Sequence, residues 1–386
     1  MPLPARLHPT HATSTSPGRT NSGRTNPTRR LLAGLLLACL PLTACSLVGT
    51  SSDDPSSDTS SGPRPTTVKL VTHESFALPD ELIAAFESRT GMKLDVQAAA
   101  DAGTLTNKLV LTQGSPAGDV AFGVDNTFAS RALDAGVFAP FKADLPDGVA
   151  QFELPSTDGG TDNRLVPIDN GNVCVNIDTG WFASRGIPAP ATFDDLVKKP
   201  YKNLTVIPGA ATSSPGMAFL LATIAKYGED GWPDYWRKLM DNGVKLTSGW
   251  SDAYFVDFTQ GGGTGKRPIV LSYDSSPAFT VPKGGDSSTT AALLDTCFQQ
   301  VEYAGVLAGA ANPEGAEEFI DFMLSEEVQA ALPDSMYVFP VRSGVPLPAD
   351  WAKYAVQPTA PATIDPQTIA ENRDAWLREW TDITTR

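Results

Sequence analysis

Hydrophobic runs short enough to be β-strands alternate with amphipathic stretches from about residue 67 onward. Residues 79–81 begin a helix, and residues 104–112 predict a second one. In the first helix the apolar residues Leu82, Ile83 and Phe86 share one face. Three runs around these helices predict strands: residues 68–72 (VKLVT), 93–98 (KLDVQA) and 119–125 (DVAFGVD). This alternation indicates a parallel sheet with helices on its faces.

A second alternating block begins at residue 165. Residues 165–178 (LVPIDNGNVCVNID) form one long extended run, and residues 217–227 predict an apolar helix. Shorter strands are predicted at residues 204–207 (LTVI), 243–248 (GVKLTS) and 267–274 (RPIVLSYD). The pattern therefore predicts an α/β protein, long enough for one large or two medium-sized domains.

Polar side chains follow two predicted strands of the first block. His73, Glu74 and Ser75 come directly after the first strand, and Asp125 and Asn126 come at the end of the third. Because ligands sit at the carboxyl ends of strands in such sheets, these residues are candidates for ligand contact. For Ser75 and Asn126, a role in helix caps and turns is an equal alternative.

The segment PGAATSSPG lies between a strand and a helix of the second block. Thr212, Ser213 and Ser214 are candidate N-caps of that helix, and Pro215 suits its first turn. A helix N-terminus rich in hydroxyl groups also suits an anion, since its N–H groups are free and its dipole is positive. Capping and anion binding both stay open from these residues.

The stretch SGWSDAY places two aromatic rings and a carboxylate close together after a predicted strand. Trp250 and Tyr254 either belong to the core or form a ring surface that binds a flat cation. We expect Tyr254 to pack in the core and Trp250 to contact ligand. Asp252 suits the cap of a helix that follows, and Tyr273 suits a packed position in its strand.

The N-terminal region is typical of an exported lipoprotein. Residues 31–42 form a 12-residue apolar run preceded by two arginines, which is too short to span a bilayer. Its ending, Leu-Thr-Ala-Cys, predicts removal of residues 1–44 and lipid attachment at Cys45, with simple cleavage nearby as the alternative. Residues 45–65 predict a flexible tether. We therefore expect an exported protein anchored on the outer face of the cell membrane, by general or twin-arginine export.

Charge and residue usage narrow the function classes. The first 44 residues hold five of 29 basic and none of 44 acidic residues, so the rest carries 24 against 44, a formal net charge of −20. This negative charge disfavours binding to nucleic acid or to anionic lipid. We therefore expect the protein to contact the membrane only through its lipid anchor. With His73 as the one His beyond the signal, a His-rich zinc site is excluded and a Ser-His-Asp site would depend on His73 alone. We expect no enzyme activity, cofactor or metal, although paired carboxylates for glycoside hydrolysis stay open.

Two cysteines follow the predicted anchor, Cys174 and Cys297. In an exported protein two such cysteines favour pairing. We predict a disulfide between Cys174 and Cys297, with two buried free thiols as the alternative.

Several motifs together carry a resemblance to the thiamine-binding lipoproteins and periplasmic proteins that feed ABC importers. They occur in the order and approximate spacing of that family: HESFALP, GDVAFGVDN, VPIDNGNVCVNID, TSSPGMAFLL, SGWSDAY, VLSYDSSPAF, VEYAGVLAGAANPEGAEEFIDFMLS and MYVFPV. The resemblance runs from about residue 67 to the helix NRDAWLREW near the C-terminus. GWSDAY with LSYDSSPAF is its most specific part, whereas NPEGAEEFIDFMLS marks solute-binding proteins in general.

The resemblance implies a two-lobed α/β fold, the type II periplasmic-binding-protein fold. Each lobe would be a mostly parallel sheet flanked by helices, with the ligand in the cleft between the lobes. Three crossings of the chain would assign residues 66–169 and 268–303 to one lobe, and residues 170–267 and 304–386 to the other. The predicted disulfide would then lie near the hinge.

The resemblance also implies the rings that hold the ligand. Thiamine is a cationic thiazolium joined to a flat aminopyrimidine, with a hydroxyethyl arm that can carry phosphate. The aromatic positions of the family match Trp250, Phe279 and Tyr337, whose faces suit such a cation. Phe279 and Tyr337 stand where the family has a Tyr and a Trp, and His73 stands where it has a Tyr.

Polar contacts are implied by the same resemblance. Asp125, Asp169 and Glu74 would balance the thiazolium charge or accept a hydrogen bond from the pyrimidine amino group. The hydroxyethyl or phosphate end would meet the loop before the apolar helix, which contains Thr212, Ser213, Ser214 and Gly216.

The function so implied is that of a monomeric solute-binding protein. It would capture thiamine or its phosphate esters and deliver them to the permease and ATPase subunits of an ABC importer, without making or breaking bonds. A polyamine is an alternative ligand, because it too would use aromatic rings and carboxylates. Ferric iron is less favoured as the ligand, because SYDSS offers only Tyr273 where related iron proteins use adjacent tyrosines. An exported enzyme or a partner-binding lipoprotein is the alternative from another class.

Overall fold

The computed structural model describes residues 65–156 and 160–385, which belong to one compact unit beginning at Pro63. The predicted signal peptide, the predicted lipid-attachment residue Cys45 and all but the last residue of the predicted tether lie outside the described residues. No helix in the described ranges is long and apolar enough to cross a membrane.

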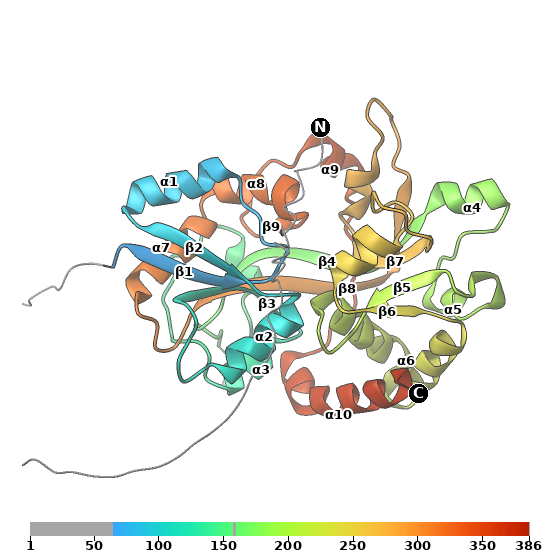
Figure 1. The fold of residues 1–386 in the computed structure, drawn as a ribbon, viewed down its shortest axis with the longest axis horizontal. Helices are drawn as coiled ribbons and strands as arrows, with labels where there is room; N and C mark the ends of the chain where they lie inside the picture. Colours follow the sequence, from blue (N-terminus) through green and yellow to red (C-terminus); the bar gives the residue numbers. More distant parts are fainter. Residues whose placement is uncertain (1–64, 157–159, 386) are drawn as a thin grey trace, which may run out of the picture. The chain divides into compact units, whose positions relative to one another are not determined.

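The described residues form one mixed β-sheet with the order β2-β1-β3-β8-β4-β7-β5-β6 (Figure 1). A short strand, β9, pairs with β4. The strands are β1 Thr67–Thr72, β2 Lys93–Ala98, β3 Val120–Asp125, β4 Val166–Asp178, β5 Thr205–Pro208, β6 Lys245–Thr247, β7 Ile269–Tyr273, β8 Thr290–Val306 and β9 Phe339–Pro340. The strands predicted from the apolar runs are therefore confirmed, whereas β8 and β9 were not predicted.

Parallel pairing lies at the two ends of the sheet and antiparallel pairing in its middle. We call β1, β2 and β3 the β1 end, and β5, β6 and β7 the β5 end. Within the β1 end, β1 pairs parallel with β2 and β3, and within the β5 end, β5 pairs parallel with β6 and β7. The long strands β4 and β8 pair antiparallel with each other and join the two ends (Figure 1).

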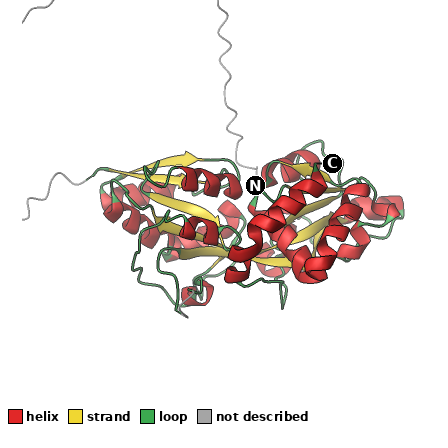
Figure 2. Ribbon diagram, turned by 90° about the horizontal axis from the view of Figure 1, so that it is seen from below, coloured by secondary structure: helices red, strands yellow, loops and turns green. Residues whose placement is uncertain are grey.

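Helices surround the strands in Figure 2. Their bounds are α1 Asp80–Thr90, α2 Ala102–Leu111, α3 Ala129–Asp134, α4 Thr179–Arg185, α5 Phe193–Leu196, α6 Ser214–Asp241, α7 Pro313–Met323, α8 Glu326–Met336, α9 Ala349–Tyr354 and α10 Pro366–Thr384. Short helical turns occur at η1 Val149–Phe152, η2 Lys199–Tyr201, η3 Asp252–Asp257 and η4 Ser276–Thr280. The helix predicted at residues 217–227 is the first part of α6, which kinks at Gly228, where φ is 71°.

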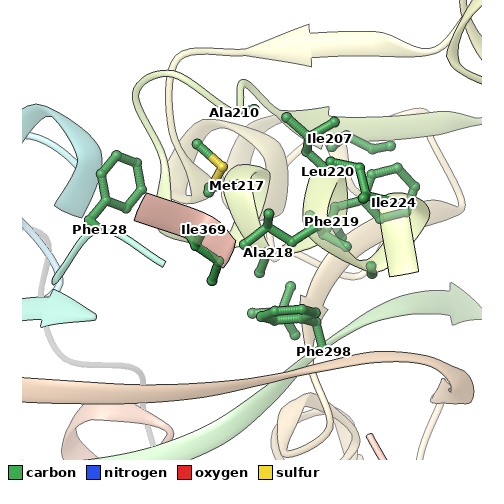
Figure 3. Packing of buried hydrophobic residues seen from close by; sticks show 14 of the residues in the cluster. Phe128, Ile207, Ala210, Met217, Ala218, Phe219, Leu220, Ile224, Phe298 and Ile369 are labelled. Atoms are coloured by element: carbon green, nitrogen blue, oxygen red, sulfur yellow. The ribbon is translucent and has the colours of Figure 1, made fainter. Parts of the chain in front are cut away.

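The largest hydrophobic core forms around α6. Figure 3 shows the α6 side chains Met217, Leu220 and Ile224 gathered with Phe298 of β8 and Ile369 of α10. This cluster also includes side chains of the β1 end, so a continuous apolar core connects the two ends of the sheet. Burial of these side chains holds the N-terminus of α6 in a fixed place.

A second core lies at the β1 end. Phe86 of α1 packs between Phe319 and Phe322 of α7, with ring centroids 5.5 and 5.4 Å apart. Asn312, the N-cap of α7, donates to the carbonyl of Thr67 at 3.0 Å. Helix α7 therefore belongs with the β1 end.

The expected division into lobes does not match the strand pairing at two places. The division put residues 268–303 with the first lobe, but β7 pairs with β5, a strand of the other lobe. It put residues 304–386 with the second lobe, but α7 packs on the β1 end. Hydrogen bonding along β4 and β8 explains the difference, because each strand runs from one end of the sheet to the other.

The predicted disulfide is present between Cys174 of β4 and Cys297 of β8. It closes a loop with a sequence separation of 123 residues. Because β4 and β8 are the strands that join the two ends of the sheet, the bond fixes the junction between them.

Candidate ligand-binding site

Three carboxyl groups stand in a row across three neighbouring strands. Glu302 of β8 is paired with Asp125 of β3 on one side and with Asp169 of β4 on the other. The exposed fractions of Asp125, Asp169 and Glu302 are 0%, 1% and 7%. We call these three residues the carboxyl row. Glu302 was not predicted, although an acidic residue inside an apolar strand pattern is a signal that marks such a position.

His73 lies at one end of β1 beside the carboxyl row. Its Nε2 is 3.2 Å from Glu302 Oε1, and its side chain is buried. Burial lowers the pKa of His73, but the charge and hydrogen bond of Glu302, together with the charges of Asp101 and Glu74, raise it overall. Gly123 makes room for the imidazole, because a Cβ there would stand 2.0 Å from His73 Cδ2.

Burial governs the protonation of the carboxyl row. Burial first, and then the charge of Glu302, raise the pKa of Asp169 well above its ordinary value. Burial also raises the pKa of Asp125 to about 7, against the lowering effect of hydrogen bonds from Ser214 and Thr127. Buried carboxyls this close are stabilised by a proton or by a cation between them.

Asp169 is the member of the row with the poorest hydrogen bonding. Neither of its oxygens meets an N–H or hydroxyl donor among the described residues. Nearby, Thr72 Oγ1 and Gln300 Oε1 are also buried without a hydrogen-bond partner in that part of the chain. Such buried polar atoms are uncommon in folded proteins and point to groups supplied from outside the chain.

Asp101, which was not predicted, connects the two ends of the sheet. It is the N-cap of α2, where its side chain accepts from Ala102 N at 2.7 Å. The same carboxylate accepts from Ser214 N at 3.1 Å and from Trp250 N at 2.8 Å. The residue that begins α2, shortly after β2, thus binds both the first turn of α6 and the loop that carries Trp250.

The hydroxyl groups before α6 are all engaged with other protein groups. Ser214 Oγ donates to Asp125, and Thr212 Oγ1 donates to Ser248 O at 2.7 Å. Ser213 is the N-cap, and its Oγ accepts from Gly216 N at 3.4 Å. The capping interpretation is confirmed for Ser213, and Ser214 joins the loop to the carboxyl row.

Trp250 lies half-buried in a cluster of rings next to the β5 end. It stacks on Tyr254 with centroids 5.0 Å apart, and its centroid is 6.2 Å from that of Tyr273. Its Nε1 donates to Ser272 Oγ at 3.0 Å. Tyr254 is buried, as predicted, while Trp250 keeps part of its surface exposed.

Phe279 and Tyr337 form a second pair of rings. Their centroids are 3.9 Å apart, and Phe279 also contacts Trp351 edge-on at 5.5 Å. Tyr337 has a φ of 66° and ends α8, and its carbonyl accepts from Ser275 Oγ at 2.7 Å. Burial, and then Tyr337, raise the pKa of the Tyr254 hydroxyl.

The predicted site residues are thus partly brought together. His73, Asp125 and Asp169 meet in and beside the carboxyl row, and Ser214 joins them. Asp101 accepts from both Ser214 N and Trp250 N, and Ser214 Oγ donates to Asp125, so hydrogen bonds connect Trp250 to the row. Glu74, by contrast, is exposed. No group of three or more His, Cys, Asp or Glu side chains within residues 65–156 and 160–385 is placed to hold a metal ion.

Comparisons with known proteins agree with this fold. The chain matches the family described as bacterial extracellular solute-binding protein over residues 81–359. It is 30% identical over 320 residues to the thiamine-binding periplasmic protein of Escherichia coli, covering 82% of this chain and 92% of that protein. Its fold is similar to the solved structure of a periplasmic thiamin binding protein, with a TM-score of 0.70, 29% identity and coverage of 84% and 99%.

A relative with lower sequence identity is named for iron uptake. The iron uptake protein A1 of Synechocystis is 24% identical over 308 residues, covering 72% of this chain and 77% of that protein. The structural match confirms the α/β periplasmic-binding-protein fold, and the family match agrees with the expectation of a binding protein rather than an enzyme. Because the matched segment spans well over half of the sequence, the chain belongs to the bacterial extracellular solute-binding protein family.

Proposed function

We propose that this protein captures thiamine outside the cytoplasm and delivers it to an ABC importer. The observation that carries the proposal is the buried carboxyl row of Asp125, Glu302 and Asp169. Hydrogen bonds through Ser214 and Asp101 connect this row to the half-buried Trp250. A desolvated group of acids needs a positive charge, and an aromatic face favours a delocalised cation. The thiamine-binding names of similar proteins support the same ligand.

The ligand's two rings suit the two kinds of group. In the proposed complex the thiazolium lies against Trp250, where a cation contact contributes ~0.5–2 kcal/mol. The pyrimidine amino group donates to Asp169, whose oxygens meet no N–H or hydroxyl donor among the described residues. A ligand group that provides the missing donor satisfies a buried acceptor and removes the cost of leaving it unpaired.

Capture would couple to closure of the two ends of the sheet. Asp125 and Asp169 lie towards the β1 end and Trp250 next to the β5 end, so one ligand would contact both. A ligand that contacts both ends favours the closed arrangement over an open one by differential contact. The closed form would then dock on the permease, with hydrolysis of ATP performed by a separate subunit.

We propose that the protein is exported and anchored to the membrane by a lipid. The apolar run at residues 31–42 and the Leu-Thr-Ala-Cys sequence before residue 46 support secretion and lipid attachment at Cys45. The protein would act as a monomer tethered to the outer face of the membrane by residues 45–65. Mass spectrometry of the protein extracted from membranes tests the anchor by the presence or absence of a diacylglycerol adduct on Cys45.

The ligand is tested by calorimetric titration of the purified protein with thiamine, spermidine and ferric citrate in parallel. We expect saturable one-to-one binding of thiamine at a Kd in the micromolar range or below, which corresponds to about 8 kcal/mol or more. Spermidine shares the positive charge but lacks rings, and ferric citrate lacks both features of the proposed contact. Binding of spermidine or ferric citrate without thiamine would leave the family assignment intact and overturn the ligand.

A further inference from the structure

We propose that helices α3 and α10 bind a small monovalent inorganic anion, such as chloride, between the guanidinium groups of Arg131 and Arg373. The anion accepts hydrogen bonds that no group of the described chain accepts, and it neutralises two like charges in a buried contact. The inference does not depend on which solute the protein carries.

The two arginines come close together where α10 packs on α3. Ile369 of α10 belongs to the same apolar core as Phe128, the N-cap of α3 (Figure 3). Arg373 follows Ile369 by one helical turn, and its guanidinium lies 4.6 Å from the centroid of the Phe128 ring. Arg131 follows Phe128 by three residues, and Ala132 N donates to Phe128 O, so Phe128 and Arg131 are neighbours on one helical turn. Arg373 therefore lies over a ring that stands next to Arg131.

Each guanidinium has a buried donor without an acceptor. The Nε atoms of Arg131 and Arg373 are both buried without a hydrogen-bond partner among the described residues. Arg373 is 5% exposed, whereas Arg131 is half-buried. A buried N–H group without an acceptor is uncommon in folded proteins, and it costs more free energy when the group is charged. Two such donors next to one ring indicate an acceptor that the chain itself does not provide.

The acids of the protein do not neutralise this pair. Asp374 Oδ1 lies 3.6 Å from Arg373 Nη1, but the Asp374 side chain is 72% exposed, and an ion pair in solvent contributes little. Asp125 also interacts with Arg373, yet its carboxyl accepts from Thr127 Oγ1 at 2.8 Å, and its pKa of about 7 leaves it partly protonated near neutral pH. Burial first, and then the charge of Arg131, lower the pKa of Arg373 to about 10. An anion next to both guanidinium groups opposes this destabilisation of their charged forms.

The surroundings favour a small monovalent anion over phosphate or sulfate. A pocket between the same two helices is lined by acids, among them Asp134 of α3 and Asp365, the N-cap of α10. These acids repel a divalent anion more strongly than a monovalent one. Two guanidinium groups opposed by Asp374 leave about one positive charge, which one chloride ion balances.

Two substitutions of Arg131 test the site. Arg131→Gln removes one of the two positive charges, and Arg131→Glu places a carboxylate next to Arg373 in place of the anion. Arg185→Gln is the matched control, because Arg185 also lies over an aromatic ring, 4.1 Å from the centroid of Trp181 on α4. Melting temperatures are measured in sodium chloride and in sodium gluconate at equal ionic strength, since gluconate is too large for a buried pair of guanidinium groups.

The readout is the chloride response, the melting temperature in chloride minus that in gluconate. A general effect of either salt is shared by all four proteins, whereas binding at the site is not. We expect the response of the native protein and of Arg185→Gln to exceed that of both Arg131 variants by ~2 °C. In gluconate, Arg131→Glu should melt above the native protein, because its carboxylate pairs with Arg373. An equal chloride response in the native protein and in Arg131→Gln would overturn the inference and leave the proposed function intact.

Discussion

Asp169 of β4 lies directly opposite Glu302 of β8, and both carboxyls are buried. Asp125 of β3 faces Glu302 from the other side, so one buried acid stands between two others. Because the region is desolvated, the pKa of Asp169 is raised well above its ordinary value and that of Asp125 to about 7. Near neutral pH this row takes up a proton or a cation, and the proposed ligand is a cation.

Thiamine affinity is expected to rise with pH. Between about pH 6 and about pH 8 Asp125 loses its proton, as its raised pKa of about 7 requires, and the ionised row attracts the thiazolium more strongly. His73, whose pKa is also raised, loses its positive charge in the same direction. Calorimetry across this range should show a several-fold fall in Kd, and Asp125→Asn, which removes the group that titrates near pH 7, should flatten the profile. Tighter binding at the acidic end would contradict the proposal that the ionised row attracts a cationic ligand.

Stability of the unliganded protein should change in the opposite direction. A carboxyl whose pKa is raised on folding binds its proton more tightly in the folded than in the unfolded state, so stability is lost as pH rises towards the folded value. For Asp125 that loss extends to about pH 7. The free energy of unfolding should fall by on the order of 2 kcal/mol between about pH 5.5 and pH 8, measured by urea titration. A stability that rises steadily over this interval would show that the row is not buried as described.

Loss of the Trp250 ring should weaken binding. Trp250→Ala removes a stacked face, and we expect a cost of about 1–3 kcal/mol in thiamine binding free energy. Trp181→Ala is the matched control, because Trp181 is also half-buried but stacks under Arg185 at 4.1 Å on α4. Equal thiamine affinity in the native protein and in Trp250→Ala would remove Trp250 from the site.

Gly123→Ala should disturb His73 and the carboxyl row. The new Cβ would stand 2.0 Å from the His73 ring, and the residue has a φ of 100°. Gly91→Ala is the control for backbone strain, since Gly91 has a φ of 72° and nothing within 4 Å of a new Cβ. We expect Gly91→Ala to cost about 1 kcal/mol of stability and to leave thiamine affinity unchanged. Gly123→Ala should cost more and also weaken binding; equal effects of the two changes would show that His73 does not depend on Gly123.

Removal of the disulfide should lower stability more than affinity. The bond between Cys174 and Cys297 closes a long loop, and replacement of both by Ser should cost about 2–5 kcal/mol of unfolding free energy. Thermal melts of native and double-Ser protein give the loss, and thiamine titration at low temperature gives the affinity. A double variant as stable as the native protein would show that β4 and β8 hold the junction without the bond.

Local patterns predicted much of this fold because their causes are local. The alternation of apolar runs and amphipathic helices predicted β1 to β7 and the first part of α6, and Gly228 ends that part with a positive φ. The pattern missed β8, whose pairing with β3 and β4 joins residues far apart in the sequence. The expected lobe boundaries differed from the observed pairing for the same reason.

Some candidate site residues carry a local signal. Asp125 stood out at the end of a predicted strand and Trp250 in an aromatic stretch, whereas Asp169 was expected only from the family resemblance. Asp101 resembles an ordinary N-cap in the sequence, and its contact with Trp250, 149 residues away, exists only in the folded chain. Contacts of this kind are set by tertiary packing and leave no local pattern.

The most direct test of the account is a crystal structure of the protein grown with thiamine. We predict the thiazolium within ~6 Å of the Trp250 ring centroid and the pyrimidine amino group ~2.7–3.2 Å from a carboxyl oxygen of Asp169. The hydroxyethyl arm should point towards the loop before α6, with Asp101 still bonded to Ser214 and Trp250. Thiamine bound elsewhere, for example in the surface pocket lined by Gln151, Asn170 and Arg342, would contradict the site and the mechanism built on it.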